Sequence, residues 1–507
     1  MLRETFTENG RVRGVVGTDA RITVYKGIPF ADDTSGKNRW CPPQPANDWD
    51  GVRVCSEFGP APFQPEPGVT NPYLAFYARE WHVDSKVPMG EDCLRANIWT
   101  PAKTADEKLP VMVWIFGGGL MTGYPHEMEF DGERIASRGV VLVSIGYRVN
   151  AFAQFAHPQL TAEQPEAPAN FSFLDQAAGL AWVKRNIANF GGDPDNVTIF
   201  GQSSGAMSVL VHMCSPKTEG LFNRGIAQSI GGMVSRIPSA GGVGCQPLEE
   251  MEQVGIRLFE KLGVKTLEEA RAVDAKTLCD AWFSLNAFLG ATIDGVFIPK
   301  SVDECFRDGE VKDLPLMIGC TKDEFLAPPR GETDEEILEG VRKQFGEYAD
   351  GFIASLDPNL PLKEAATLHN VRLGTEMLAT TAAGNGQKIY NYYFCPTIPG
   401  DDAGCFHSCD LWFTFETLMK CWRPFDGHHF MLARKMCNYW TNFAKTGDPN
   451  GLDKDGTPMP TWTPYTLESQ HPMVFGDEVY MDTEPRPAKE QYLLDVNLAA
   501  VEKEKQQ

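Results

Sequence analysis

The sequence contains no apolar run of about 18 residues, the length that a helix needs to cross a bilayer. Its first segment, Met1–Thr7, also lacks the apolar core of a secretory signal peptide. The 13 cysteines are odd in number and show no paired spacing, so a disulfide framework is not expected. These absences predict a cytoplasmic protein without a membrane segment, in which the thiols stay reduced.

A surplus of basic residues is missing as well. The sequence holds 46 Lys and Arg against 68 Asp and Glu, which gives a formal net charge of −22 at pH 7. A chain of this charge is repelled by nucleic acid and by anionic membrane surfaces. Neither nucleic acid nor a membrane is therefore expected as a partner.

Nothing in the sequence divides its 507 residues into separate units, because it has no Ser/Gly-rich or Pro-rich linker and no repeat of fixed period. We therefore expect one large domain over residues 1–507, since α/β folds often exceed the usual domain length. Two charged segments rich in Leu, Glu and Lys, residues 245–310 and 326–385, have a helical pattern. They predict helical insertions that cap the carboxyl ends of the strands, where open α/β sheets place their sites.

Several apolar segments predict the strands of a buried sheet. Leu109–Phe116 and Val140–Ile145 are apolar without alternation, which is typical of strands covered on both faces. Leu314–Ile318 and Ile389–Phe394 indicate later strands, and segments with helical spacing lie between them. This alternation predicts the α/β class, with a large, mostly parallel central sheet and helices on both faces. Residues 31–90, rich in Pro, Asp and aromatic residues, are interpreted as long surface loops.

The clearest chemical signal is a predicted strand-to-helix turn. Val197–Phe200 has the composition of a buried strand, and Ala206–Cys214 that of a buried helix. Between them, the segment Gly201-Gln202-Ser203-Ser204-Gly205 matches Gly-x-Ser-x-Gly, the nucleophile elbow that exposes a serine hydroxyl. Glycine flanks the serine because so tight a turn leaves no room for side chains. The motif alone also fits an ordinary Gly/Ser turn, so other features of the chain have to decide.

A serine nucleophile needs a base, a carboxylate that orients the base, and hydrogen-bond donors for the oxyanion. Three glycines, Gly117–Gly119, directly follow the predicted strand Leu109–Phe116. They let backbone N–H groups converge on one point, as in the oxyanion loop of lipases and esterases. The N–H of Ser204, at the start of a helix with its positive partial charge, is expected to supply the remaining donor.

His407 is the histidine whose position suits the base. It follows the predicted strand Ile389–Phe394 by a single loop, and the usual order of serine, acid and histidine excludes the histidines before the elbow. Those before the elbow are His82, His126 and His157, and the others after it are His212, His369, His428, His429 and His471. The acid is expected after the strand Leu314–Ile318, where position alone does not separate Asp323 from Glu324.

A metal site is the competing interpretation of the loop that contains His407. Cys405, His407 and Cys409 are all residue types that bind metals, but their spacing is not that of a zinc site. The sequence also shows no second cluster of such residues. We therefore expect neither a metal nor a cofactor.

Taken together, these motifs resemble those of the type-B carboxylesterase family, which includes cholinesterases, bacterial para-nitrobenzyl-type esterases and some fungal lipases. The likeness covers nearly the whole chain. It is carried by the segments Glu91–Leu94, Val113–Gly119, Leu174–Gln176, Phe190–Gly201, Asp323–Glu324, His407 with Asp410–Leu411, and Phe443–Gly447.

The resemblance implies the α/β-hydrolase fold and a serine carboxylesterase that hydrolyses small-molecule esters through an acyl-enzyme intermediate. The implied site residues are the nucleophile Ser203, the acid Glu324, the base His407, and the oxyanion donors Gly118, Gly119 and Ser204. Two alternatives stay open: a catalytically silent adhesion or binding relative of the same fold, and an amidase or lipase with the same machinery.

The chain departs from the family pattern near the implied site. Gln202 stands where the residue before the nucleophile is usually Glu, which removes a buried negative charge and argues against a preference for cationic substrates. Leu120 replaces the aromatic residue that commonly follows the three glycines, so it is expected to reshape the acyl pocket. Phe325 replaces the usual glycine after the acid. Trp81 lies roughly where cholinesterases place an aromatic residue that binds the alcohol part, although a packed loop tryptophan fits equally well.

Overall fold

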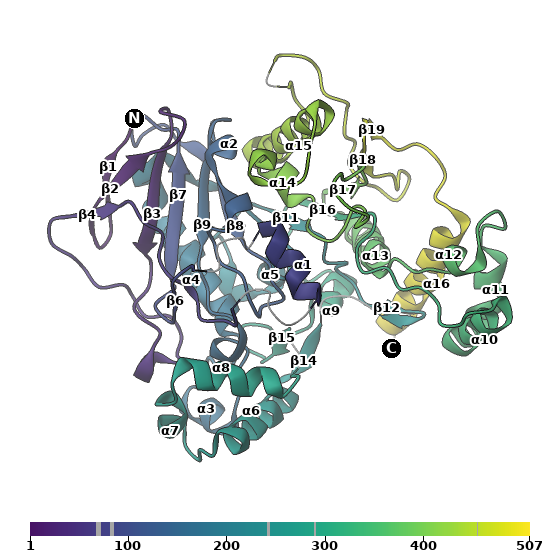
Figure 1. Cartoon of the computed structure of the whole chain (residues 1–507), viewed down its shortest axis with the longest axis horizontal. Helices are drawn as coiled ribbons and strands as arrows, with labels where there is room; N and C mark the ends of the chain where they lie inside the picture. The colour runs from purple at the N-terminus through teal and green to yellow at the C-terminus, as the bar shows by residue number, and fades with distance from the viewer. Residues whose placement is uncertain (67–71, 82–85, 241–243, 288–289, 454, 507) are drawn as a thin grey trace.

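The computed structural model describes residues 1–66, 72–81, 86–240, 244–287, 290–453 and 455–506, and Figure 1 shows the whole chain. Its centre is a large sheet, 13-stranded within this described part, in the order β1-β2-β3-β7-β9-β8-β10-β11-β16-β17-β18-β19 with β4 beside β2. The strand bounds are β1 Glu4–Thr7, β2 Gly10–Val16, β3 Thr23–Pro29, β4 Val52–Cys55, β7 Arg95–Thr100, β8 Leu109–Ile115, β9 Val141–Ile145, β10 Gly192–Gln202, β11 Arg224–Gln228, β16 Leu316–Thr321, β17 Ile389–Phe394, β18 Met473–Phe475 and β19 Val479–Met481.

The middle of this sheet is parallel. Strands β9, β8, β10, β11, β16, β17 and β18 pair parallel in that order, whereas the pairs β1–β2, β2–β3, β3–β7, β7–β9 and β18–β19 are antiparallel. The apolar residues 111–115 of β8 and all of β9 are buried, as expected for strands covered on both faces. The predicted α/β class with a mostly parallel sheet is confirmed.

Helices pack along the sheet. The helices α4 (Phe171–Asn186), α5 (Ser204–Cys214) and α15 (Gly427–Thr446) contact β10 at its centre, and α13 (Asn370–Gly384) contacts β16 and β17. The connection from β10 directly into α5 therefore lies against packed structure, with Gln202 and Ser204 buried and Ser203 partly exposed. A residue at that junction is held by structure on both sides.

Helices occupy much of the two segments that the sequence marks as insertions. Residues 245–310 contain α6 (Leu248–Leu262), α7 (Leu267–Arg271), α8 (Ala275–Ser284) and α9 (Val302–Asp308). Residues 326–385 contain α10 (Asp334–Phe345), α11 (Ala349–Ala354), α12 (Leu362–Ala365) and α13. Figure 1 shows α6, α7 and α8 grouped around α3 (Pro158–Glu163) at the bottom of the view, and α10, α11 and α12 grouped beside the C-terminal helix α16 (Ala488–Lys505).

The segment 31–90 is more structured than its composition indicates. It contains β4 and the helix α1 (Pro72–Trp81), which Figure 1 shows in front of the sheet. Trp40 is fully buried, and its ring stacks on that of Phe155 with centroids 4.1 Å apart. The interpretation of this segment as surface loops was wrong in part, because α1 is a helix and Trp40 and Trp81 are buried in the core.

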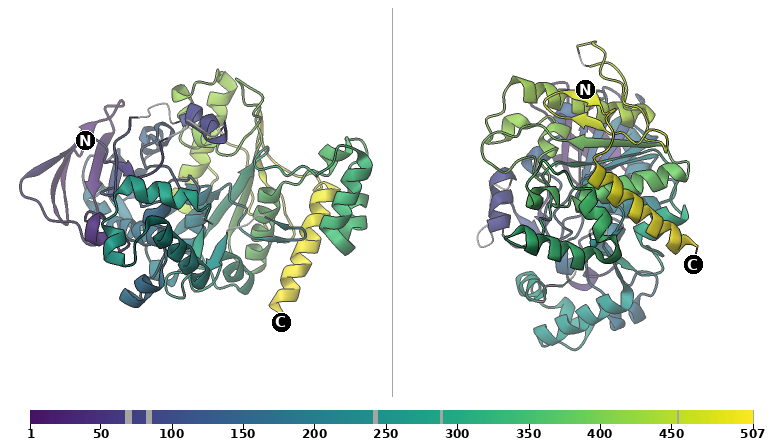
Figure 2. Two further views of the ribbon diagram at one scale, coloured as in Figure 1. Left: turned by 60° about the horizontal axis from the view of Figure 1, so that its bottom comes forward. Right: turned by 90° about the vertical axis from the view of Figure 1, so that its right-hand side faces the viewer.

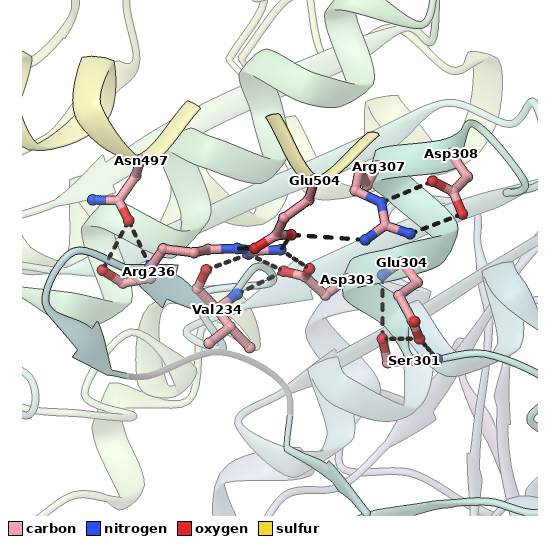
Figure 3. A network of polar contacts seen from close by, with 10 residues as sticks. Val234, Arg236, Ser301, Asp303, Glu304, Arg307, Asp308, Asn497 and Glu504 are labelled. Atoms are coloured by element: carbon pink, nitrogen blue, oxygen red, sulfur yellow. Dashed lines mark hydrogen bonds and ion pairs between the residues drawn. The ribbon is translucent and has the colours of Figure 1, made fainter. Parts of the chain in front are cut away.

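The helix α16 is joined to the body of the molecule through Arg236. Figure 2 shows this helix in yellow along one side, and Figure 3 shows the guanidinium of Arg236 between two carboxylates. Its Nη2 lies 2.6 Å from Oδ2 of Asp303 on α9 and 2.7 Å from Oε2 of Glu504 on α16. The backbone N–H of Arg236 also donates to Oδ1 of Asn497 on α16 at 2.6 Å. One residue thus links three segments that are distant in the sequence.

Two further observations concern the membrane and the thiols. Within the described ranges, no helix is both long enough and apolar enough to traverse a bilayer. All 13 cysteines lie in these ranges, and each is a free thiol.

Candidate active site

Ser203 lies at the junction between β10 and α5. Its φ of 57° and ψ of −126° place a non-glycine residue in a strained backbone region. The N–H of Ser203 donates to the carbonyl of Gln228 on β11 at 2.8 Å, and its carbonyl accepts from the N–H of Met207 at 2.9 Å. The strained conformation is thus held from both sides, as the elbow motif predicts.

The glycines on either side of Ser203 are required by close backbone contacts. A Cβ on Gly201 would lie 2.4 Å from the carbonyl carbon of Gly205, and a Cβ on Gly205 would lie 2.1 Å from the carbonyl oxygen of Ile115. Both distances are far below any real carbon contact. The turn can therefore form only with glycine at these two positions.

The loop after β17 brings His407 to Glu324. A hydrogen bond joins Nδ1 of His407 to Oε2 of Glu324, and both side chains are buried. Oε1 of Glu324 accepts from the N–H of Thr321 at 2.8 Å, which fixes the carboxylate. Asp323 makes a different contact, because its Oδ2 accepts from the N–H of Cys405 at 2.7 Å. Of the two acids that the sequence left open, Glu324 is the one that contacts the imidazole.

The other ring nitrogen of His407 faces Gln202. Nε2 of His407 lies 3.2 Å from Nε2 of Gln202. Because an amide N–H can only donate, this contact needs an unprotonated ring Nε2 and leaves the ring proton on Nδ1, where Glu324 accepts it. A neutral imidazole with its lone pair on Nε2 is the form in which a histidine can act as a general base.

Ser203 and His407 line the same cavity, which has a volume of about 470 Å³. Gly117–Gly119 and Gln202 also line it. Much of the remaining wall is aromatic or apolar and includes Tyr77, Trp81, Met121, Phe130, Phe283 and Leu411. A cavity of this size and character suits a small organic molecule. Within the described part of the chain, the first insertion contributes Phe283 of α8 to this wall, whereas residues 326–385 contribute none.

The glycine loop after β8 is held close to the elbow. Gly118 and Gly119 have φ values of 112° and 67°, and a Cβ on Gly118 would lie 2.2 Å from the carbonyl oxygen of Thr122. The N–H of Leu120 donates to Oγ of Ser204 at 3.1 Å, which ties this loop to the start of α5. The loop can thus present backbone N–H groups to the cavity beside Ser203.

Trp81 and Leu120 were the two expected substrate contacts, and only Trp81 lines the cavity. Trp81 lines the cavity, and its ring packs against Tyr77 at 5.4 Å between centroids. The side chain of Leu120 is fully buried and is not among the residues that line the cavity, where its neighbour Met121 is found instead. The backbone of Leu120 has a positive φ of 58°.

Several residues that line the cavity belong to no recognisable motif, so the sequence did not indicate them. Tyr77 lies on α1, inside the segment that was interpreted as loops. Glu127 and Glu129 line the cavity although both are buried. One signal was present: between Leu109 and Phe130 these are the only Asp, Glu, Lys or Arg residues. Charged residues are rarely buried, so charges isolated within an apolar stretch indicate a functional role.

Two neighbours of His407 complete its surroundings. Phe325 has a positive φ of 46°, which explains why glycine is usual there in the family that the sequence resembles, and its ring lies 4.3 Å from the imidazole between centroids. Asp410 is fully buried, and burial together with the charge of Glu324 raises its pKa to about 6. Its Oδ2 accepts from Nε2 of Gln228 at 2.9 Å and from the Tyr392 hydroxyl at 3.2 Å.

The contacts of His407 also argue against a metal site formed with the two nearby cysteines. The sulfur atoms of Cys405 and Cys409 lie 3.6 Å apart. Both ring nitrogens of His407, however, are engaged by Glu324 and Gln202 rather than by the thiols. The interpretation of the Cys-His-Cys segment as metal ligands is therefore not supported by geometry.

Four other histidines have structural contacts. His212 is fully buried on α5, its Nε2 lies 2.9 Å from Oε1 of Gln176, and burial lowers its pKa to about 3. Nε2 of His369 donates to the carbonyl of Thr321 at 2.8 Å. His428 and His429 lie at the start of α15, where Asp426 caps the helix. His82 lies outside the described residues.

The sequence matches a known family over most of its length. The model of the family described as "Carboxylesterase family" matches residues 3–352 and 359–493. Acetylcholinesterase of Bungarus fasciatus is 30% identical over 506 residues, which cover 90% of this chain and 80% of that protein. Para-nitrobenzyl esterase of Bacillus subtilis (strain 168) is 28% identical over 503 residues, which cover 96% of this chain and 97% of that protein.

Solved structures give the same result. A carboxylesterase of Geobacillus stearothermophilus, crystallised at pH 6.2, superposes with a TM-score of 0.77 and 31% identity, covering 97% of this chain and 100% of the other. A thermophilic para-nitrobenzyl (PNB) esterase superposes with a TM-score of 0.78 and 27% identity, again over 97% of this chain and 100% of the other.

Proposed function

Since this chain belongs to the carboxylesterase family and is a serine carboxylesterase, we propose that Ser203, His407 and Glu324 form its catalytic triad. The observation that carries the proposal is the hydrogen bond between His407 and Glu324 at the wall of the cavity that Ser203 also lines. The substrates are small-molecule esters. Nothing in the comparisons favours a catalytically silent binding protein.

In the proposed acylation step, Oγ of Ser203 attacks the ester carbonyl carbon while Nε2 of His407 takes the hydroxyl proton. Glu324 keeps the other ring proton on Nδ1 and stabilises the imidazolium that forms. The negative charge on the carbonyl oxygen is held by the N–H groups of Gly118, Gly119 and Ser204. Because these groups are fixed by backbone geometry, they need little rearrangement as the charge develops.

Collapse of the tetrahedral intermediate breaks the bond between the carbonyl carbon and the alcohol oxygen. The imidazolium of His407 gives its proton to that oxygen, and the alcohol leaves. Water then attacks the acyl group on Ser203 by the same route, with His407 again as base, and releases the acid. The overall reaction consumes one water and requires no other reactant.

A fluorophosphonate probe tests the identity of the nucleophile. Such a probe phosphonylates an activated serine, so it is expected to label the wild-type protein once, and peptide mapping should place the label on Ser203. Neighbouring serines, among them Ser204 and Ser208, are expected to stay unmodified. A label on another serine, or ester hydrolysis by a protein that resists the probe, would contradict the proposal.

Gln202 offers a test of the base, because its amide lies 3.2 Å from Nε2 of His407. In Gln202→Glu, a carboxylate replaces the amide and stabilises the protonated imidazole. The protonated form cannot accept a proton from Ser203, so activity should be lost at a higher pH than in the wild type. The acid limb of the kcat/KM profile is expected to shift upward by roughly one pH unit. An unchanged acid limb would argue against His407 as the base.

We also propose the domain organisation of the protein and the compartment in which it works. The whole chain, residues 1–507, acts as one domain, supported by a single central sheet whose strands come from both ends of the sequence. The protein works in the cytoplasm, supported by its thirteen free thiols, since cysteines remain reduced in that compartment.

A further inference from the structure

A group of metal-ligand side chains lies at the start of α15, outside the catalytic cavity. Asp426, His428 and His429 each offer one ligand atom, and these atoms lie within 4.8 Å of one another. Oδ1 of Asp426 is 2.6 Å from Nδ1 of His428 and 2.9 Å from Nδ1 of His429. Asp426 also caps the helix, since its Oδ1 accepts from the backbone N–H of His428 at 3.1 Å. The cap explains the position of the carboxylate, but it does not explain why two imidazoles join it.

The hydrogen bonds of His429 show which of its ring nitrogens carries a proton. Nε2 lies 2.8 Å from the carbonyl oxygen of Thr397, and because a carbonyl can only accept, Nε2 is the protonated nitrogen. Nδ1 accepts from the backbone N–H of Asp426 at 3.2 Å, so this atom presents a lone pair. The same Nδ1 lies 2.9 Å from the carboxylate oxygen Oδ1 of Asp426. Two acceptor atoms this close repel each other unless a cation or a second ring proton separates them.

The imidazole of His428 lies between two carboxylates. Its Nδ1 faces Asp426, and its Nε2 lies 3.5 Å from Oδ1 of Asp477, in the turn between β18 and β19. Among the described residues, this Nε2 has no hydrogen-bond partner. Asp477 is itself held in place, because its two carboxylate oxygens accept from the N–H and the hydroxyl of Thr397 at 3.0 and 3.1 Å. A proton on Nε2 would therefore face the carboxylate of Asp477 and leave the lone pair of Nδ1 directed at Asp426.

Both imidazoles thus have the outer partners that metal-binding histidines need. A histidine that binds a metal generally turns its other ring nitrogen toward a carbonyl or a carboxylate, which keeps the proton there and leaves a lone pair for the metal. Thr397 supplies the carbonyl for His429, and Asp477 supplies the carboxylate for His428. Two imidazole nitrogens and one carboxylate oxygen form a ligand set that suits Zn²⁺ and leaves one position for water. Mg²⁺ and Ca²⁺ prefer ligand sets of oxygen alone.

An ion can reach this cluster from solvent. The side chains of Asp426 and His428 are 67% and 38% exposed, whereas that of His429 is only 4% exposed and forms the inner wall. Zinc bonds of about 2.0–2.2 Å hold neighbouring ligand atoms about 3–3.4 Å apart. The present distances of 2.6 and 2.9 Å would have to widen by less than about 1 Å to accept the ion. The cluster is therefore nearly arranged for binding.

We propose that Asp426, His428 and His429 bind a divalent transition-metal ion of the zinc type, through Oδ1 of the aspartate and Nδ1 of each histidine, with water in the remaining position. The ion separates the carboxylate oxygen from the two ring nitrogens. Through Thr397 and Asp477, it joins the start of α15 to the loop after β17 and to the turn between β18 and β19. The ion takes no part in ester hydrolysis, because none of its three ligands lines the catalytic cavity.

The test is a calorimetric titration of the EDTA-treated full chain with Zn²⁺ near neutral pH. The wild type and Ser203→Ala are both expected to bind the ion at this site with the same affinity, and an excess of Mg²⁺ should not compete. Co²⁺ serves as the spectroscopic probe, because nitrogen and oxygen ligands give it visible d–d bands without a thiolate charge-transfer band. The spectrum thus separates this site from binding by the 13 free thiols.

Four variants separate the ligands from their outer partners. His428→Ala removes a ligand, and Asp426→Asn removes the charge while keeping an oxygen that can cap the helix. Each should weaken Zn²⁺ binding by more than about tenfold, since even an outer partner is worth that much. Asp477→Asn changes only the outer partner of His428 and should weaken binding by about tenfold. His471→Ala is the matched control, because it removes a partly buried histidine outside the cluster. Thermal unfolding without metal verifies that each variant is folded.

Each outcome decides the proposal. Zinc binding that is weakened in His428→Ala and Asp426→Asn and kept in His471→Ala supports it. It is overturned if the wild type binds no Zn²⁺, in which case a ring proton alone separates Asp426 from the histidines. Equal affinity in His428→Ala and the wild type, equal binding of Mg²⁺, or Co²⁺ bound only through thiolates would overturn it as well. The result does not depend on the catalytic triad, because Ser203→Ala is titrated beside the wild type.

Discussion

Replacing Ser203 by alanine is expected to lower kcat for a 4-nitrophenyl ester by about 10⁴- to 10⁶-fold, the scale seen when other serine triads lose their nucleophile. The variant keeps the cavity, the oxyanion donors and the hydrogen bond between His407 and Glu324. It loses only the Oγ atom that forms the acyl-enzyme. Its KM should therefore change far less than kcat, and it should not react with a fluorophosphonate.

The matched control for this variant is Ser208→Ala, one turn further along α5. The hydroxyl of Ser208 donates to the carbonyl oxygen of Ser204 at 3.0 Å and accepts from the amide N–H of Gln176 at 3.1 Å. Ser208 is not among the residues that line the cavity. Its removal should cost stability and change kcat by less than about tenfold. Comparable losses in Ser203→Ala and Ser208→Ala would mean that Ser203 acts through the fold of the elbow and not as the nucleophile.

The second large effect is expected at Glu324. In Glu324→Gln the amide can donate to Nδ1 of His407, which favours the ring tautomer with its proton on Nε2. That tautomer cannot take a proton from Ser203, so kcat should fall by about 10³- to 10⁴-fold while the protein stays folded. Steady-state kinetics together with thermal unfolding separate this effect from a loss of structure.

Asp323→Asn provides the comparison at the adjacent acid. Asp323 accepts from the N–H of Cys405 at 2.7 Å, and an asparagine oxygen can accept the same bond. We expect kcat to change by less than about tenfold, since the loop that carries His407 keeps its anchor. If Asp323→Asn were as damaging as Glu324→Gln, the assignment of the triad acid would have to be reversed.

The sheet and the elbow were predictable because their signals are local. The strand β17 begins and ends at the predicted residues, Ile389 and Phe394, since a run of apolar and aromatic residues interrupted only by Asn391 indicates a buried strand. The predicted strand Leu314–Ile318 was less accurate, and β16 begins at Leu316. Pro315 lacks the N–H that a central strand must donate, which places the start after it. Family, fold class and activity followed from such motifs and are confirmed.

The details of the cavity were not predictable because they depend on contacts between distant segments. Position along the chain left both Asp323 and Glu324 open, and only the family resemblance implied Glu324, because the choice depends on His407, which lies 83 residues beyond Glu324. The contact between Gln202 and the imidazole likewise requires two loops to meet. The burial of Glu127 and Glu129 appears only when the chain closes around them, since their isolation in an apolar stretch does not say which surface covers them.

The link between Arg236 and the helix α16 has a consequence for the order of assembly during folding. Asp303 lies 67 residues from Arg236, but Glu504 lies 268 residues away, so the second contact closes a much longer loop at a higher entropic cost. The sheet with its catalytic loops can therefore form while α16 is still undocked. In that intermediate, the apolar surface against which Leu493, Leu494 and Val501 pack is exposed to other chains. Aggregation during refolding should thus depend on how fast this helix docks, a step far from the catalytic residues.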